Sequence, residues 1–599
     1  MLIEGHDAQV TIRIGNCSGY YGDRASAMGE MLAGGDLDFL TGDYLAELTM
    51  LILGRDRMKN PDAGYAKTFV RQMTANLALA KDRGVRIVTN AGGLNPAGLA
   101  DVLRTIAAEQ AVDVTIAHVE GDDLAPRADE LGFGSTLTAN AYLGAFGIAA
   151  ALQAGADVVV TGRVTDASVV VGPAIAAFGW GRDEVDALAG AVVAGHVIEC
   201  GTQATGGNFS GFRSLDLTRP LGFPIAEIAA DGSSVITKHD ETGGAVTVDT
   251  VTAQLVYEVQ GPVYLNPDVA THLDSVRLEQ VGADRVAISG VRGSAPPATT
   301  KVCLNTLGGY RNSVEFLLTG LDIPAKAAWI RGQIEAALAA GTPPAQIEWQ
   351  LDRTDRFDPE TQAAATSQLR CHVRDDAAEP VGRAFSDAAV QLALASYPGF
   401  TVTRPPAAGT PVGVYRAAYV PQTEVPHVVV HADGRREDIA PPPGAVDLRP
   451  NGSVAGPAVD VRPNEASEGR ESTDPSETRR VPLGELVHAR SGDKGGDANV
   501  GVWIPAEHPR REAAFAWLAA QLTPDRVREL LPEAAPLDVE VHPLASIAAV
   551  NIVVHGLLGE GVASSTRSDP QAKALGEWLR ARVVDIPIEL LTPATEETA

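Results

Sequence analysis

The sequence contains little cysteine and little positive charge. Its 599 residues include four cysteines, none of them in a CxxC pair, which excludes a disulfide scaffold and predicts a reducing cytoplasm. Lysine and arginine number 48 against 76 aspartates and glutamates, giving a net charge of −28. This acidic balance argues against nucleic acid or an anionic membrane as partner, because both require a basic surface. A small anionic ligand needs only a local pocket and is not excluded.

Targeting and membrane-spanning patterns are also missing. Residues 1–15 carry Glu4 and Asp7 where a signal peptide has basic residues followed by an apolar run. The most apolar stretch, residues 144–160, is interrupted by Gln153 and Asp157, so no membrane span is expected. We therefore expect a cytoplasmic protein without a membrane partner.

Common catalytic signatures are absent as well. Gly15, Gly19 and Gly22 do not have the spacing of the dinucleotide-binding GxGxxG motif, and no GxxxxGK[ST], HExxH or GxSxG motif occurs. His427 and His431 would share a strand face, but no third ligand accompanies them. These absences remove support for NAD, ATP, zinc-peptidase and serine-hydrolase functions.

The composition is that of a globular chain. Apolar residues make up 45% and charged residues 21%, and the length allows two to four domains at roughly 150 residues each. With 61 glycines but only 5% aromatics, we expect closely packed small residues and many glycine turns.

Residues 1–200 alternate between apolar strands and helices, which predicts an α/β fold with a parallel sheet covered on both faces. Strands are predicted at 10–14, 39–40, 85–89, 112–117 and 158–161, and helices at 25–32, 63–83, 96–109, 139–154 and 184–198. Residues 200–455 indicate a mixed α+β extension of the same domain. There the pattern predicts strands at 245–248, 251–259, 285–291 and 300–304, and helices at 324–340 and 384–396.

A domain boundary is predicted at residues 456–481, a polar stretch with almost no apolar side chain that we expect to be a flexible linker. Residues 482–599 then form a small α+β domain. Its strands are predicted at 485–489, 500–504, 537–542 and 547–555, and its helices at 511–522 and 570–583.

Each predicted parallel strand ends in a polar, glycine-rich cluster, at 15–24, 41–44, 89–95, 120–123 and 161–166. Ligands of parallel α/β sheets bind beyond the carboxyl ends of the strands, where glycines and helix N-termini offer free N–H groups. Ordinary turns use the same residues as caps, but five such clusters on one edge predict a binding site. Its candidate substrate-binding residues are Asn16, Ser18, Asp23, Arg24, Gly92, Gly93, Arg163 and Asp166.

Within this edge, Asp23, Asp43 and Asp166 are candidates for acid–base work or for a divalent metal. Arg24 and Arg163 can hold a carboxylate or phosphate in two-point contact. A structural salt bridge or cap is the alternative reading of each residue.

Two further clusters carry unusual polar residues. In the first, Glu199 lies at a helix C-terminus, where the dipole disfavours a carboxylate, so it needs a partner or a function. His196 shares its helix face and makes a buried hydrogen-bonded pair the alternative. The glycine-rich segment that follows supplies Asn208 together with Gly206 and Gly207.

The second of these clusters spans residues 488–499 in the small domain. Arg490 and Lys494, together with free backbone amides, can cradle a phosphate or carboxylate. An exposed, charged hairpin tip is the alternative.

These clusters resemble the acyclic terpene utilisation (AtuA) family. The segments IRIGNCSGYYGDR, TGDYLAELTM, TNAGGLNP, TGRVTDAS, HVIECGTQATGGNFSG and KVCLNTLGGYRNS carry the likeness over residues 1–455, and HARSGDKGGDANVGVW is similar to the family's small ferredoxin-like domain over 482–599. The resemblance implies bacterial catabolism of citronellol- and geraniol-type terpenes through branched acyl-CoA thioesters. It assigns no catalytic residue, so the site residues rest on the strand-end positions.

We therefore expect an enzyme, a lyase that hydrates, dehydrates or cleaves a branched acyl-CoA. Glu199 or Asp43 is the predicted base, and Asn90 and Asn208 are predicted donors to a thioester enolate. Arg24, Arg163, Arg490 or Lys494 would hold an anionic group. The sequence assigns no cofactor: coenzyme A enters as the thioester substrate, and a divalent metal at Asp23, Asp43 and Asp166 is an open alternative.

Two other functions stay open. One is a non-catalytic assembly partner of an acyl-CoA carboxylase or another pathway enzyme, which the linker and the detachable small domain favour. The other is the same chemistry on a steroid or polyketide acid. A homo-oligomer is expected in each case, because glycine- and alanine-rich α/β enzymes often pair.

Overall fold

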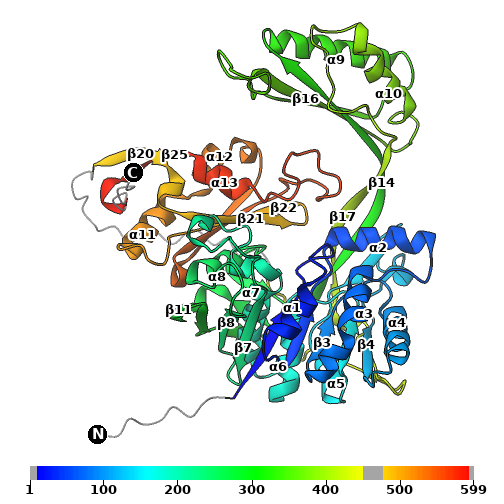
Figure 1. The fold of residues 1–599 in the computed structure, drawn as a ribbon, viewed down its shortest axis with the longest axis vertical. Helices are drawn as coiled ribbons and strands as arrows, with labels where there is room; N and C mark the ends of the chain where they lie inside the picture. The colour runs from blue at the N-terminus through cyan, green and yellow to red at the C-terminus, as the bar shows by residue number, and fades with distance from the viewer. Residues whose placement is uncertain (1–9, 450–476, 592–599) are drawn as a thin grey trace. The chain divides into compact units, whose positions relative to one another are not determined.

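The computed structural model describes residues 10–449 and 477–591, and Figure 1 shows the course of the chain. The chain divides into two compact units, Met1–Asn305 with Tyr415–Ala599, and Thr306–Val414. The sequence indicated no boundary at the second unit. None of the described helices is both long enough and apolar enough to cross a membrane.

An eleven-stranded sheet organises the first unit, and its five central strands are parallel. In spatial order they are β1 (Thr11–Asn16), β2 (Phe39–Gly42), β3 (Arg86–Thr89), β6 (Val158–Thr161) and β4 (Ile116–Glu120). These are the five strands that the sequence predicts, with shifted bounds. Antiparallel strands extend both sides of the sheet: β7 (Pro224–Ala229), β8 (Ser234–Lys238), β12 (Arg285–Ser289) and β11 (Arg277–Gly282) beyond β1, and β18 (Val428–Val430) and β19 (Arg436–Asp438) beyond β4.

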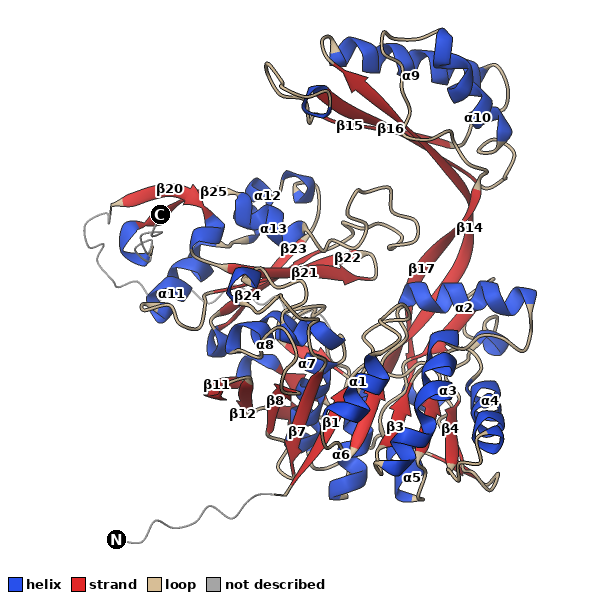
Figure 2. Ribbon diagram, viewed as in Figure 1, coloured by secondary structure: helices blue, strands red, loops and turns tan. Residues whose placement is uncertain are grey.

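Helices cover both faces of the parallel strands, as the continuous apolar strands predict (Figure 2). Neighbouring residues of one strand point to opposite faces, so Ile87 packs in one apolar core and Val88 in the other. The core around Ile87 contains α1 (Ala27–Gly34), α3 (Lys67–Asp82) and α4 (Pro96–Glu109). The core around Val88 contains α5 (Phe146–Gln153), α6 (Ser168–Phe178) and α7 (Val185–Ile198).

Local patterns misled the prediction at several places. Residues 251–259 were expected as a strand because of their β-branched side chains, but α8 (Val248–Leu255) occupies most of them. Thr247 and Thr250 form a reciprocal capping box that begins this helix, and no strand covers 245–248. Residues 139–141, expected as helix, belong to β5 (Thr138–Ala141), which pairs with β14 (Thr299–Thr319). Helices α2 (Glu47–Lys59) and α6 were not predicted.

The second unit has its own sheet and core. Its strand order is β15 (Gln346–Asp352), β16 (Thr366–Asp375), β14 and β17 (Thr410–Pro421). Helices α9 (Ile323–Ala339) and α10 (Arg383–Val390) pack on this sheet through side chains such as Ile330 and Phe385. Both helices were predicted, α10 with too late an end.

The C-terminal domain is a four-stranded antiparallel sheet with helices, in agreement with the predicted α+β class. The order is β21 (His488–Lys494), β22 (Asp497–Trp503), β24 (Ala549–Val554) and β23 (Val539–Leu544). The helices are α11 (Arg511–Gln521), α12 (Pro524–Leu530) and α13 (Leu575–Ala581), and β20 (Thr478–Pro482) pairs with β25 (Val583–Pro587). Most of the predicted linker, 456–481, lies outside the described residues, and its last residues belong to β20.

The C-terminal domain shares an apolar core with the large sheet's domain. Trp503, Leu544 and Ile547 lie in the same buried cluster as the helices around Val88. The indole N–H of Trp503 also donates to Asp249 at 3.1 Å, and the backbone N–H of Glu258 donates to Asn499 at 2.8 Å. The charged β21–β22 hairpin is thereby placed next to the strand ends.

Candidate active site

A cavity of about 530 Å³ lies at the carboxyl ends of the parallel strands. Its walls come from the ends of β1, β2 and β6, from the end of α7, and from the C-terminal domain. The predicted residues that line it are Asp23, Asp43, Arg163, Asp166, Glu199, Gly207, Asn208 and Lys494. The strand-end rule thus locates a cavity, and five of the sequence clusters contribute to it, three at strand ends, one around Glu199 and one at 488–499.

Three carboxylates converge in this cavity. One oxygen atom each of Asp43, Asp166 and Glu199 lies within 4.8 Å of the others. Asp43 follows β2, Asp166 follows β6 and Glu199 ends α7. Asp43 is 5% and Glu199 4% exposed, so the cluster combines like charges with little access to water.

Asp43 is held in place by two donors. Its Oδ1 accepts the backbone N–H of Leu45 at 2.9 Å and the side-chain amide of Asn90 at 2.7 Å. The Oδ1 of Asn90 in turn accepts the N–H of Tyr44 at 2.8 Å. Burial, reinforced by the charge of Asp166, holds the pKa of Asp43 well above its usual range. Asn90, predicted as a donor to substrate, is engaged with Asp43 and acts as its positioning residue.

Glu199, the third member of the cluster, has one carboxylate oxygen without a hydrogen-bond partner among the described residues. Its Oε1 lies 3.3 Å from Nδ1 of His196, and its Oε2 has no hydrogen-bond partner among the described residues. Burial and the charge of Asp166 raise the pKa of Glu199 well above its usual value. Burial lowers the pKa of His196 to about 4, so its ring is neutral at pH 7 and does not balance the carboxylate.

Arg163 supplies the positive charge in contact with the cluster. Its Nη2 lies 3.2 Å from Oδ1 of Asp166, and its Nη1 donates to the carbonyl oxygen of Leu45 at 2.6 Å. The guanidinium also lies 4.3 Å from the centre of the Tyr142 ring. These contacts fix Arg163 as a wall of the cavity, and the salt-bridge reading of this residue is the one its contacts support.

The C-terminal domain lines the cavity with Asp493, Lys494 and Lys573. The ammonium group of Lys573 donates to the hydroxyl of Tyr257 at 2.9 Å. Burial and the nearby carboxylate of Glu258 raise the pKa of Asp493 to about 7. The cavity therefore carries carboxylates from the strand ends and ammonium groups from the small domain.

Two family models match the chain. Residues 12–431 match the acyclic terpene utilisation family protein AtuA, and residues 481–585 match the AtuA ferredoxin-like domain. The chain belongs to the AtuA family. The resemblance found in the sequence motifs is confirmed, and the small C-terminal domain is ferredoxin-like. No curated protein and no solved structure matches the chain.

Several predicted site residues of this AtuA-family chain have structural contacts instead. Arg24 pairs with Glu30 and donates to the carbonyl oxygen of Leu221 at 2.9 Å. Arg490 donates to Gln203 and lies 4.1 Å from the ring centre of Tyr257. Neither arginine lines the cavity, so their predicted role in holding an anion has no support from position. Of the four predicted cations, Arg163 and Lys494 line the cavity.

The remaining predicted residues shape the turns around the cavity. Asp23 lines the cavity but accepts the N–H groups of Gly19 and Arg24 at 3.0 and 2.9 Å. Glu199 occupies the place beside Asp43 and Asp166 that was expected for Asp23. The hydroxyl of Ser18 donates to the carbonyl of Tyr20 at 3.0 Å. The turn glycines Gly92, Gly93 and Gly206 lie outside the lining, while Asn208 lines the cavity with a left-handed φ of 55°.

Other lining residues escaped the prediction. Glu258 sits at a left-handed φ of 58°, just after α8, within a segment read as strand. Lys573 and Gln571 precede α13 in a segment read as helix. Their local sequence carries no pattern that points to a site.

A second chamber of about 420 Å³ adjoins the first. The two share Tyr142, Asp166, Glu258 and Lys494 as lining residues. Its other walls include the apolar side chains of Val263, Leu265 and Tyr419, and also Lys301, which pairs with Glu47 at 3.0 Å. The cavity at the strand ends therefore continues into a partly apolar space.

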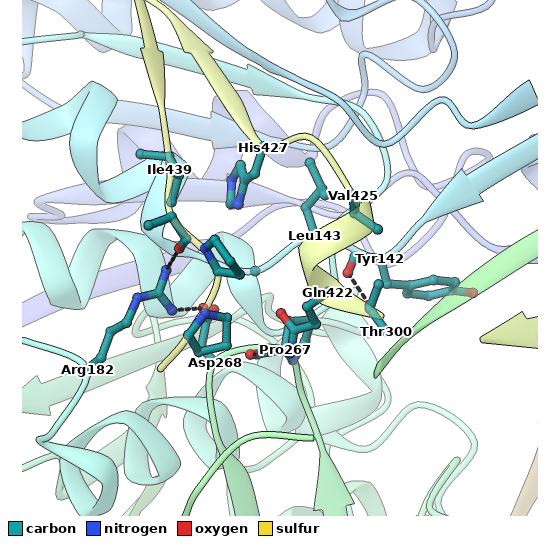
Figure 3. A pocket seen from close by; sticks show the side chains of 14 residues that line it. Tyr142, Leu143, Arg182, Pro267, Asp268, Thr300, Gln422, Val425, His427 and Ile439 are labelled. Atoms are coloured by element: carbon teal, nitrogen blue, oxygen red, sulfur yellow. Dashed lines mark hydrogen bonds and ion pairs between the residues drawn. The ribbon is translucent and has the colours of Figure 1, made fainter. Parts of the chain in front are cut away.

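A third, much smaller cavity of about 30 Å³ lies beside Arg182 and Asp268 (Figure 3). Arg182 lies 3.3 Å from Asp268, whose other oxygen accepts the N–H of Ala145 at 2.6 Å. The space is enough for only one or two water molecules. His427 lines it, whereas His431 pairs with Glu437 at 2.9 Å. His427 thus packs in the wall of this small cavity, and His431 is the partner of Glu437.

Proposed function

We propose that the chain is an enzyme of acyclic terpene or related branched-chain acid catabolism that acts on an acyl-CoA thioester, by adding or removing water or by cleaving a carbon–carbon bond. Membership of the AtuA family supports the terpene context. One observation carries the enzymatic part. Carboxylates from the strand ends and ammonium groups from the ferredoxin-like domain line the same cavity.

These reactions need two kinds of group. A proton must move at a carbon or oxygen near the thioester carbonyl, and the negative charge that develops on the carbonyl oxygen must be stabilised. Asp493 suits proton transfer, because it lines the cavity and its pKa of about 7 lies near neutral pH. The ammonium groups of Lys494 and Lys573 can stabilise the negative charge of the enolate oxygen or of a substrate carboxylate. The assignment of Glu199 or Asp43 as the catalytic base stays a prediction.

The size of the cavities fits part of the substrate. Ligand pockets usually measure about 300–1,000 Å³, and the two adjoining chambers of about 530 and 420 Å³ lie in this range. We assign the thioester and the reacting carbons to the chamber with the carboxylates. The partly apolar chamber, with Val263 and Leu265, takes the branched hydrocarbon tail.

The test is mass spectrometry of a branched acyl-CoA panel incubated with the purified protein, with and without Mg²⁺ or Mn²⁺. A gain or loss of water, or a split acyl chain, is expected. Glu199→Gln and Asp43→Asn should each lower turnover by about 100-fold or more, with melting temperatures no lower than that of the wild type.

Matched controls make the same chemical changes at the surface. Glu109→Gln and Asp82→Asn alter exposed carboxylates and should retain full turnover. Full activity of both cavity variants would contradict the proposed site. If no acyl-CoA changes at all, the assembly role or a non-CoA acid takes the place of this proposal, and co-purification from native lysate separates those two.

A further inference from the structure

The cluster of Asp43, Asp166 and Glu199 carries more negative charge than the groups in contact with it balance. Arg163 is the cation that pairs with it among the described residues, through Asp166 at 3.2 Å. Three carboxylates against one guanidinium leave an excess of two negative charges when all are ionised. Buried like charges are costly unless a cation or a proton neutralises them.

The buried side chain of His196, which is not part of the cluster, also lacks hydrogen-bond partners within the part of the chain that the structure describes. His196 is 2% exposed, and its Nδ1 lies 3.3 Å from Oε1 of Glu199. Neither of its ring nitrogens has a hydrogen-bond partner among the described residues, nor has Oε2 of Glu199. Buried polar atoms are nearly always paired, so a group that engages this end of α7 belongs in the space beside Glu199.

We propose that Asp43, Asp166 and Glu199 bind one divalent cation of the Mg²⁺ or Mn²⁺ class. Hard divalent cations prefer carboxylate oxygens, and oxygens within 4.8 Å of one another are close enough to share one ion. The charge of a dication equals the excess of the cluster. The donor set contains no thiolate, since Cys17, Cys200 and Cys303 are not part of it, which disfavours a soft metal.

The inference deepens the proposed function, because it places a cation in the chamber assigned to the reacting carbons. A bound dication supplies Lewis-acid stabilisation of an oxyanion. The carboxylates of the cluster are then ligands, and Asp493 on the facing domain is the carboxyl that moves the proton. The three ligands proposed for the cation differ in one residue from the set predicted from the sequence, because Glu199 takes the place of Asp23.

The test measures the metal alone. The full-length protein is treated with chelator, dialysed, and titrated with Mn²⁺ at pH 7.5 by isothermal calorimetry and by electron paramagnetic resonance of free Mn²⁺. One bound ion per chain is expected, displaced by excess Mg²⁺. Asp166→Asn and Glu199→Gln should each weaken binding at least about tenfold.

Asp23→Asn is the matched control, because Asp23 lines the same cavity outside the cluster, and its Mn²⁺ affinity should equal that of the wild type. Asp166 is only partly buried, so its variant tests the idea without a change at the buried Asp43. Absence of Mn²⁺ binding to the wild type, or equal affinity in Asp166→Asn and Asp23→Asn, would overturn the proposal. Mn²⁺ binding without turnover of any acyl-CoA would reject the proposed function and keep the site.

Discussion

The side-chain amide of Asn16 donates to the carbonyl oxygens of both Ile198 and Glu199, each at 2.7 Å. Asn16 ends β1 and Glu199 follows α7, so this one side chain joins the first strand of the sheet to a helix terminus that is distant in the sequence. Helix ends leave carbonyl groups without intrahelical partners, and Asn16 satisfies two of them in the interior. The position of the Glu199 carboxylate therefore depends on a residue outside the cavity.

Replacing Asn16 by alanine should destabilise the fold and disturb the site together. Two buried carbonyl groups lose their donor, which costs about 2–4 kcal/mol in the free energy of unfolding. Chemical denaturation measures the loss, and Mn²⁺ titration reports whether Glu199 is displaced. Asn60→Ala, at an exposed turn, is the control and should change stability by less than about 1 kcal/mol. Wild-type stability of Asn16→Ala would contradict the anchoring role.

Gly19 is a second contact between the end of β1 and the residue after Glu199. A methyl group on Gly19 would lie 2.5 Å from the main-chain carbonyl carbon of Cys200, so Gly19→Ala forces the backbone at the end of α7 to move. We expect a lower melting temperature and a loss of turnover. Gly22→Ala meets only the ring of Tyr20 at 2.8 Å, and that exposed ring can turn away. The two variants should therefore differ in thermal unfolding, and equal behaviour would argue against the tight contact.

The parallel core was predictable because its determinants are local. Strands such as β3 and β6 are short runs of β-branched and apolar residues followed by turn-forming clusters, and this pattern is read directly from the chain. Glu199 was also predictable, because a carboxylate at a helix C-terminus opposes the helix dipole. Helix α8 was missed because the β-branched residues Val251 and Thr252 favour a strand. The capping box at Thr247 and burial in the shared core stabilise a helix there instead.

The convergence of the site was not predictable, because it depends on tertiary packing. Nothing near Asp43 in the sequence shows that it meets Asp166 and Glu199 rather than Asp23. Glu258 and Lys573 reach the cavity only because the ferredoxin-like domain packs on α8 and the shared core. For Arg24 and Arg490, the residue type suits anion binding, but nearer partners in the fold engage both guanidinium groups.

Asp122 should make the stability of the protein dependent on pH. Its Oδ2 accepts the backbone N–H of Arg163 and the amide of Asn140, each at 2.8 Å, and burial raises its pKa from 3.8 to about 7. The folded state therefore keeps this proton between pH 4 and 7 while the unfolded state releases it. The stabilisation present below pH 4 is lost as the pH rises to about 7, and it amounts to roughly a few kcal/mol.

Asp122→Asn removes this titration and keeps an acceptor oxygen. The melting temperature of the variant, relative to the wild type, should rise steadily from pH 4.5 to pH 7.5 and then level off. Asp123→Asn, at a neighbouring carboxylate that pairs with Arg57 at 3.4 Å near the surface, should show no such rise. A constant difference between Asp122→Asn and the wild type across this range would contradict the raised pKa of Asp122.

Lys494 brings an ammonium group of the ferredoxin-like domain to the cavity. Its side chain lines both chambers, and it is one of two predicted cations, with Arg163, that line the larger one. If Lys494 holds an anionic oxygen of the substrate, Lys494→Ala should lower kcat/KM by about 10- to 1,000-fold, because an interaction with a charged group of this kind contributes roughly 1.5–3 kcal/mol and more when it strengthens in the transition state.

The way in which kcat and KM change for Lys494→Ala separates two roles for the ammonium group. A rise in KM alone means that Lys494 binds an anionic group equally in the ground and transition states, whereas an equal fall in kcat and kcat/KM means that it stabilises the developing oxyanion. Lys59→Ala, at an exposed lysine outside the cavity, should leave both constants unchanged. Wild-type kinetics in Lys494→Ala would show that the ammonium group of Lys494 contributes no charge to the reaction.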